Sequence, residues 1–200
     1  MCGDCADYAD CCCDSGGCCC GESKFVLSAV SSVVGMLFVG ILAILYSIVY
    51  LSDALDFTII YSNFDYMFLC VGGVLTLIGI VALKAGDLTE GIIFTIIGLA
   101  AFVMSYGALF LGLGIDPILG WLVALVLLLA GFILIAGRDI TFGIAVLLLD
   151  LGLVVSVAFA GTDVVGMVSG LAFLFGGIVF LYIAISDWLF VETGADLPIL

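Results

Sequence analysis

After residue 24 the sequence alternates between long apolar segments and short polar breaks. Each apolar segment is about 18 to 27 residues long, which is enough for an α-helix to cross roughly 30 Å of hydrocarbon. Transmembrane barrel strands would be shorter, at about ten residues, and would alternate in polarity. The pattern predicts an all-α integral membrane protein with six transmembrane helices, near residues 25–51, 66–83, 91–114, 117–137, 142–161 and 164–186.

The basic residues set the predicted orientation of these helices. Threading six helices places all three basic residues, Lys24, Lys84 and Arg138, on one side of the membrane. The opposite loops contain acidic residues and no basic ones: Asp53, Asp56, Asp65, Asp116 and Asp163. By the positive-inside rule both termini are cytoplasmic, and the protein is predicted to be a multi-pass protein of the cell membrane.

Composition excludes several classes of function. The chain is 66% hydrophobic and only 10% charged, which a soluble protein could not bury. It contains no histidine, so a Ser-His-Asp or Cys-His catalytic site is impossible, and we expect neither an enzyme nor a cofactor. The net charge of −14 also argues against nucleic-acid binding.

Two flanking segments differ from the apolar domain at 24–188. Residues 189–200 are predicted to form a cytoplasmic C-terminal segment, and residues 1–23 a flexible cytoplasmic tail rich in Cys, Asp and Gly. The tail carries eight of the nine cysteines, namely Cys2, Cys5, Cys11, Cys12, Cys13, Cys18, Cys19 and Cys20. They are candidate metal ligands or lipidation sites, although no second C-x-x-C accompanies Cys2-x-x-Cys5. A tail without any defined ligand is the alternative.

Several short motifs follow one another along the chain in an order that can be compared with known membrane proteins. The second predicted helix carries Gly72 and Gly79 and ends in Lys84-Ala-Gly86-Asp; the third contains Phe94-Thr95 and then Gly98; the sixth carries Gly170, Gly177 and Tyr182-Ile-Ala before Asp187, Gly194 and the terminal Leu197-Pro198-Ile199. Over roughly two-thirds of the chain this order resembles the acetate uptake transporter family, the small six-helix succinate–acetate permeases. The resemblance implies transport of small monocarboxylates such as acetate. It also implies a homo-oligomeric ring, expected to be a hexamer, in which each protomer has its own path.

The sequence departs from that family at two motifs. The family's Asn-Pro-Ala-Pro-Leu-Gly-Leu before the first helix is replaced by Gly21-Glu-Ser-Lys-Phe-Val-Leu. In the third helix the family's Ser-Tyr pair is replaced by Ile96-Ile97. Both changes fall where the family handles its substrate.

Asp150 is the candidate for proton coupling, because it lies in the middle of the fifth predicted helix. A charged Asp at the bilayer centre costs about 2.5–3.5 kcal/mol on insertion scales, so such residues usually have a function. The alternative is a protonated Asp150 that hydrogen-bonds a neighbouring helix.

Candidate residues of a substrate path lie on the first and third helices. Thr95 and Tyr106 are eleven residues apart, about three helical turns, so they share a face, with Ser105 beside Tyr106. Phe94 is a candidate apolar constriction that gates by dewetting. Ser31 belongs to a small polar stripe with Ser28, Ser32 and Gly35. Alternatively, the hydroxyls bond to their own backbone, Tyr106 lies at the membrane interface and the small residues serve helix packing.

The leading hypothesis is a proton-coupled or channel-like carrier of small monocarboxylates, with the carboxylic acid, protons and the lipid bilayer as partners. No Lys or Arg lies within the membrane to pair with a carboxylate, so hydroxyls, helix dipoles and apolar constrictions would have to provide selectivity. One alternative is a non-transporting scaffold or assembly protein with a metal-binding or lipidated cysteine tail. Another is a pathway for cations or neutral solutes, favoured by the acidic loops.

Overall fold

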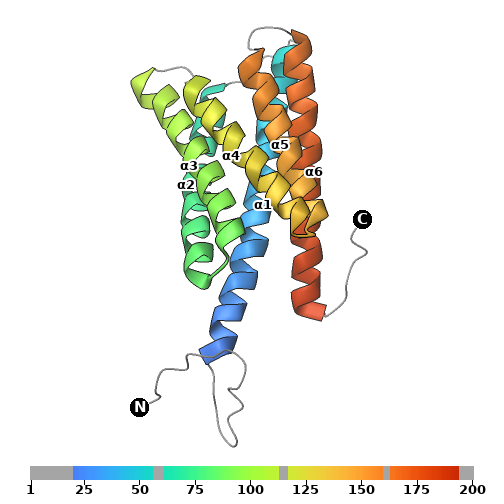
Figure 1. Ribbon diagram of the computed structural model, residues 1–200. Coiled ribbons are helices and arrows are strands. Elements are labelled where there is room, and N and C mark those ends of the chain that lie inside the picture. Colours follow the sequence, from blue (N-terminus) through green and yellow to red (C-terminus); the bar gives the residue numbers. More distant parts are fainter. Residues whose placement is uncertain (1–19, 56–60, 113–116, 160–162, 194–200) are drawn as a thin grey trace, which may run out of the picture.

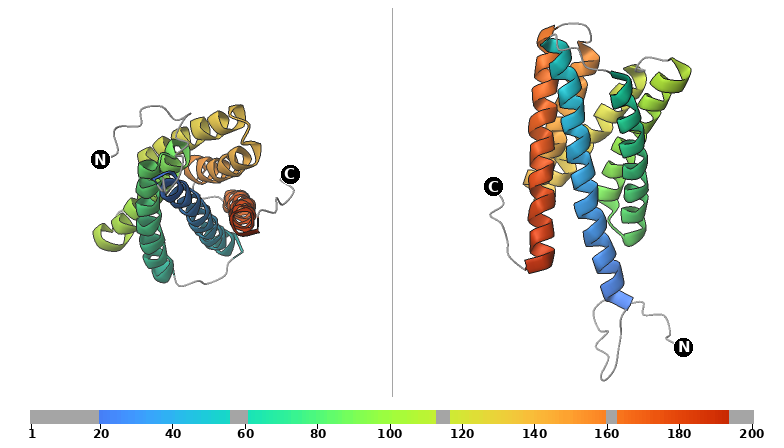
Figure 2. Two further views of the ribbon diagram at one scale, coloured as in Figure 1. Left: turned by 90° about the horizontal axis from the view of Figure 1, so that it is seen from below. Right: turned by 180° about the vertical axis from the view of Figure 1, so that it is seen from behind.

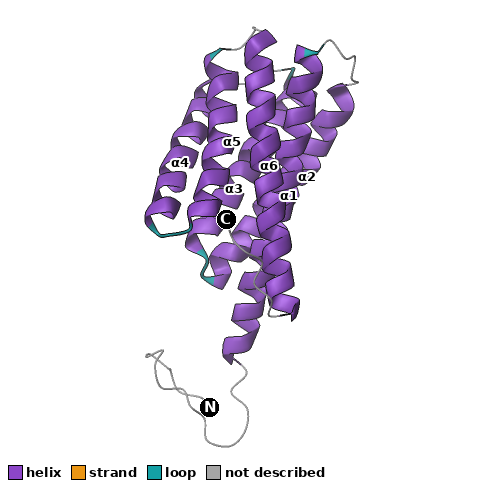
Figure 3. Ribbon diagram, turned by 90° about the vertical axis from the view of Figure 1, so that its right-hand side faces the viewer, coloured by secondary structure: helices purple, strands orange, loops and turns teal. Residues whose placement is uncertain are grey.

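The computed structural model describes residues 20–55, 61–112, 117–159 and 163–193. These residues form six α-helices and no strand: α1 (Cys20–Ala54), α2 (Tyr61–Ala85), α3 (Leu88–Tyr106), α4 (Pro117–Ala136), α5 (Ile140–Ala158) and α6 (Asp163–Thr193) (Figures 1 and 3). α3 continues into a π-helical turn, η1 (Gly107–Leu111). All six helices contain a segment long and apolar enough to cross a membrane. The predicted all-α membrane fold is therefore confirmed.

The helices extend beyond the apolar segments that predicted them. α1 begins at Cys20, inside the region 1–23 that was predicted as a tail, and α6 continues to Thr193. The spans apolar enough for the membrane are shorter, at Ser28–Ser52 and Gly166–Phe190. The difference is physical: hydropathy marks the part of a helix that lies in hydrocarbon, whereas its backbone hydrogen bonds can continue into the polar region.

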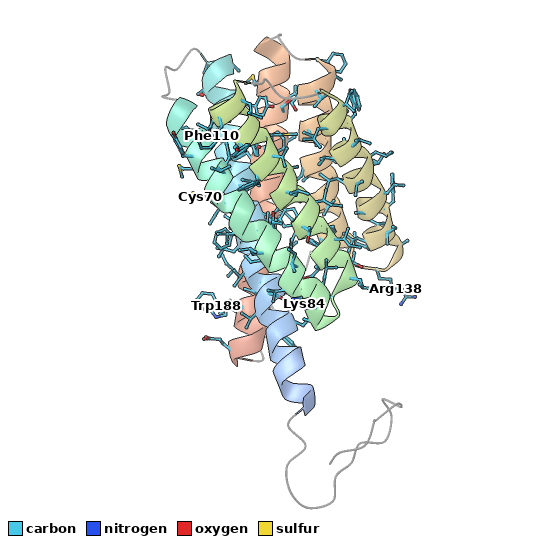
Figure 4. All side chains as sticks on the ribbon, turned by 90° about the vertical axis from the view of Figure 1, so that its left-hand side faces the viewer. Cys70, Lys84, Phe110, Arg138 and Trp188 are labelled. Carbon is cyan, nitrogen blue, oxygen red and sulfur yellow. The ribbon has the colours of Figure 1, made fainter. Side chains whose placement is uncertain are left out.

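The helices pack around one another as antiparallel and parallel neighbours. α1 packs against α6 and α2, α2 packs against α3, and α5 packs against both α4 and α6 (Figure 2). The start of α1 and the end of α6 lie at the same end of the bundle (Figure 1). This end also carries the exposed side chains of Lys84 and Arg138 (Figure 4). Its assignment to the cytoplasm remains a prediction.

Glycines permit the closest helix contacts. A Cβ added to Gly98 of α3 would lie 2.5 Å from the backbone nitrogen of Thr76 and 2.8 Å from the carbonyl oxygen of Gly72, both in α2. Between α1 and α6, a Cβ on Gly177 would lie 2.9 Å from the carbonyl oxygen of Gly40. Without a side chain the two backbones can approach, and the resulting van der Waals contact holds helices together in a membrane, where lipid removes the hydrophobic driving force.

Two tight turns at the Lys84 and Arg138 end share one hydrogen-bond pattern. The N–H of Asp87 donates to the Ala82 carbonyl at 3.0 Å, and the N–H of Asp139 donates to the Leu134 carbonyl at 3.0 Å. These are the long hydrogen bonds of Schellman motifs, which require a left-handed residue just after the helix. Gly86 (φ 104°) and Arg138 (φ 75°) occupy that position. As a result an aspartate precedes both α3 and α5 at the same end of the bundle.

Candidate functional site

A cavity of about 180 Å³ lies between α1, α3, α4, α5 and α6. Its walls are mainly apolar and include Val39, Ile97, Leu127 and Leu149. For scale, a cavity of about 150 Å³ in a soluble protein accommodates benzene. This cavity therefore has room for a small organic molecule.

Three hydroxyl-bearing residues from two helices line the cavity. Tyr46 and Tyr50 of α1 and Ser156 of α5 are among the lining residues. Ser156 lies within hydrogen-bonding reach of Tyr50, and its Oγ donates to the carbonyl of Leu153 at 2.8 Å. The cavity thus combines apolar walls with a small group of polar atoms, as small-molecule sites commonly do.

Aromatic rings hold the two tyrosines in place. The ring of Tyr46 stacks on Phe68 of α2 at a centroid distance of 4.2 Å. Phe173 of α6 stacks against both tyrosines, at 5.6 Å from Tyr46 and 5.7 Å from Tyr50. Such offset aromatic contacts restrict the rings and so orient their hydroxyls.

Phe94 lies on α3, outside the set of residues that line the cavity. Its side chain is 0% exposed and packs directly against Gly35 of α1. Phe94 stands one helical turn after Glu90 and one turn before Ile97, which lines the cavity. Along α3, Phe94 therefore lies between the cavity and the end of the bundle where Glu90 lies.

Serines and carboxylates gather at that end, and we call this group the acidic mouth: Ser28, Ser32, Asp87, Glu90, Asp139 and Asp187. The Oγ of Ser28 donates to Oδ2 of Asp87 at 2.5 Å, and Ser32 lies within hydrogen-bonding reach of Glu90. Asp87, Asp139 and Asp187 are all close enough to act electrostatically on Glu90. Glu90 lies in the first turn of α3, where the helix dipole favours a negative charge.

The predicted path residues lie in different surroundings. Ser31 is buried near the acidic mouth and donates to the carbonyl of Ser28 at 2.8 Å. The hydroxyl of Thr95 donates to the Gly91 carbonyl at 2.7 Å, and Thr95 lies against Gly79 of α2. Ser105 is buried, but neither it nor Thr95 is among the residues that line the cavity.

Tyr106 lies on an outer surface. Its side chain is exposed, with its ring 4.9 Å from that of Phe110 and 6.4 Å from that of Phe102. Of the predicted path residues, Phe94 lies on α3 between the acidic mouth and the cavity, and Ser31 lies beside the acidic mouth on α1. Thr95 and Tyr106 do not lie together, since Thr95 contacts α2 and Tyr106 is exposed.

Asp150 is buried within the bundle, with 4% of its surface exposed. No hydrogen-bond partner reaches its Oδ1 among the described residues. Asp150 follows Leu149 directly and precedes Leu153 by three residues, and both leucines line the cavity. An unpaired carboxyl group in such a position is costly, which is the usual mark of a functional residue in a membrane.

The predicted cysteine site lies outside the part of the chain that can be described. Residues 1–19 are not described, and of Cys20 only the backbone is. Within the described residues no group of three or more Cys, Asp or Glu side chains is arranged to hold a metal ion. Cys70, the remaining cysteine, is exposed on α2 (Figure 4).

Several site residues were not predicted: Tyr46, Tyr50, Ser156, Glu90 and Asp187. Tyr46 and Tyr50 carried a usable signal, because two tyrosines four residues apart inside an apolar segment share one helix face. The predicted third helix, 91–114, leaves Glu90 outside it, whereas α3 begins at Leu88, because the turn before it is shorter than the polar sequence indicates.

The fold and the site define a six-helix membrane protein with a cavity between its helices. Among solved structures, the chain is similar to the "bacterial acetate channel SatP", with a TM-score of 0.72 at 18% sequence identity, over 85% of this chain and 98% of that one. No protein-family model and no curated protein matches the sequence. The structural likeness confirms, at the level of the fold, the resemblance to the acetate uptake transporter family.

Proposed function

We propose that this chain carries short monocarboxylic acids such as acetate across the membrane, through the cavity between α1, α3, α4, α5 and α6. The observation that carries the proposal is a cavity of about 180 Å³ with apolar walls and three hydroxyl-bearing residues, in a chain that shares the fold of an acetate channel. An acid with a short alkyl group matches both the size and the chemistry of such a site.

The path runs from the acidic mouth past Phe94 into the cavity. A narrow apolar constriction excludes water and ions unless it widens, and the fully buried ring of Phe94 against Gly35 supplies one. The acidic mouth repels an anion, and that repulsion acts over about 8 Å at physiological ionic strength. Passage of the neutral acid, or of acetate together with a proton, avoids this cost.

Asp150 is the residue that we assign to proton coupling. It is buried, one of its oxygens is unpartnered, and it adjoins the lining residue Leu149. A carboxyl group in this setting can take up a proton without a nearby base to compete for it. We expect each protomer of a homo-oligomer to contain its own path, because the cavity lies among helices of one chain.

The test is uptake of labelled acetate into proteoliposomes, with and without an inwardly directed proton gradient. We expect uptake above that of empty liposomes and a further increase with the gradient. Uptake equal to that of empty liposomes under both conditions would refute the function.

A pathway for cations is the second candidate, because four carboxylates meet at the mouth. Currents in planar bilayers distinguish it from acid transport. A reversal potential that follows the Na⁺ or K⁺ gradient would favour the cation pathway, whereas acid transport predicts no such current.

A further inference from the structure

The hydroxyls of Tyr46, Tyr50 and Ser156 can recognise one particular form of the substrate. Ser156 donates its one hydroxyl proton to the Leu153 carbonyl at 2.8 Å, so toward Tyr50, which lines the same cavity, it can only accept. A hydrogen bond between the two residues therefore takes its proton from Tyr50. The lone pairs of the Tyr50 hydroxyl remain available as an acceptor, and Tyr50 lines the cavity.

A protonated carboxyl group needs both kinds of partner. Its O–H requires an acceptor, which Tyr50 offers, and its C=O requires a donor, which the hydroxyl of Tyr46 can supply. A carboxylate anion would instead need donors for both oxygens, and a positive charge to offset its own burial. The site is therefore better matched to the acid than to the anion.

The surrounding charges also favour binding of the uncharged acid over binding of the anion. Asp65 of α2 acts electrostatically on Tyr46, and Asp150 lies on α5, the helix that carries Ser156. Both groups are acidic, and the chain's three basic residues all lie outside these segments. A bound anion would meet only like charge.

We propose that Tyr46, Tyr50 and Ser156 form a carboxyl-recognition site that selects the uncharged form of a short monocarboxylic acid, whose alkyl group lies against Val39, Ile97 and Leu127. This inference rests on the proposed function and specifies its substrate form. It assigns the specificity for the substrate to three residues that lie outside the two motifs in which the sequence differs from the acetate uptake transporter family. These residues are also separate from the constriction at Phe94.

The test measures acetate binding to the purified full-length protein in detergent. Binding is followed as the rise in melting temperature with sodium acetate, compared with equal sodium chloride at each pH. We expect the apparent dissociation constant for total acetate to rise roughly tenfold per pH unit above the pKa of the acid, since only the uncharged fraction binds.

Two variants and one matched control examine the site. Tyr50→Phe should weaken binding about fivefold, the loss of one net hydrogen bond. Ser156→Ala releases the Tyr50 proton to serve as a donor, so the loss of binding with rising pH should become shallower. Tyr66→Phe removes a hydroxyl from an exposed ring on α2 and should leave binding unchanged.

The outcomes separate this inference from the proposed function. Equal affinities and equal pH profiles for Tyr50→Phe, Ser156→Ala and Tyr66→Phe would overturn the recognition site, even if the protein carries acetate. A wild-type protein that binds acetate as described but does not carry it would overturn the proposed function and leave the recognition site standing.

Discussion

Replacing Phe94 by alanine should open the constriction between the acidic mouth and the cavity. The ring is 0% exposed and packs against Gly35, so its removal leaves a void rather than a surface. A buried Phe→Ala change costs about 3–5 kcal/mol in soluble proteins. We expect about 3 kcal/mol here, because lipid as the surrounding solvent removes the hydrophobic transfer part and leaves the packing part.

A second substitution tests whether the contact with Gly35 is the cause. Gly35→Leu alone should destabilise the protein, since even an added Cβ would collide with the Phe94 ring. In the double variant the leucine fills the space that the ring vacates. The double variant should therefore be more stable than the sum of the two changes predicts, by about 2 kcal/mol, as contacting residues commonly show.

Two assays follow these variants. Thermal melting of purified protein should fall by about 6–12 °C for Phe94→Ala, taking about 2–4 °C per kcal/mol for a chain of this size. In proteoliposomes the same variant should pass chloride as well as acetate, whereas Gly35→Leu/Phe94→Ala should again exclude chloride. Additive stabilities, together with unchanged exclusion of chloride by Phe94→Ala, would refute the assignment of Phe94 as the constriction.

Asp150→Asn keeps the side-chain shape and removes the ionisable proton. Without Asp150 to protonate acetate beside the cavity, only acid that is already uncharged outside should enter, so uptake driven by a pH gradient should fall most at high external pH; wild-type uptake at every external pH would contradict its role. Gly98→Ala should lower the melting temperature, because its Cβ would lie 2.5 Å from the backbone nitrogen of Thr76, whereas Gly73→Ala, with 3.5 Å to its nearest neighbour, should be tolerated; equal melting temperatures would count against that packing.

The six helices could be predicted because the membrane imposes a simple requirement on the sequence. Any segment in hydrocarbon must be apolar and must satisfy its own backbone, so a continuous apolar run is itself the signal. The end of α2 has its own signal, because a glycine, Gly86, takes the left-handed conformation there, whereas after α4 the left-handed residue is Arg138 and not the neighbouring Gly137. Hydropathy could not mark where α1 begins at Cys20, since that turn lies outside the apolar span.

The cavity residues could not be predicted in the same way. A transmembrane helix is apolar all round, so periodicity does not reveal which face is interior. Tyr50 and Ser156 are separated by more than a hundred residues, and each alone has an ordinary explanation as an interfacial tyrosine or a backbone-bonded serine. For Thr95 the sequence allowed two interpretations, a substrate path or a hydroxyl bonded to its own helix. The structure has the second, since the hydroxyl donates to the carbonyl four residues earlier.

The most direct test of the central claim is acetate uptake by two neighbouring tryptophan variants. Ala100 lines the cavity, whereas Leu99 is 50% exposed on the outside of the same helix. With both variants first shown to be folded and monodisperse, wild type and Leu99→Trp should carry labelled acetate into proteoliposomes, and Ala100→Trp should fall to the level of empty liposomes. Uptake by Ala100→Trp as fast as by Leu99→Trp would contradict transport through this cavity.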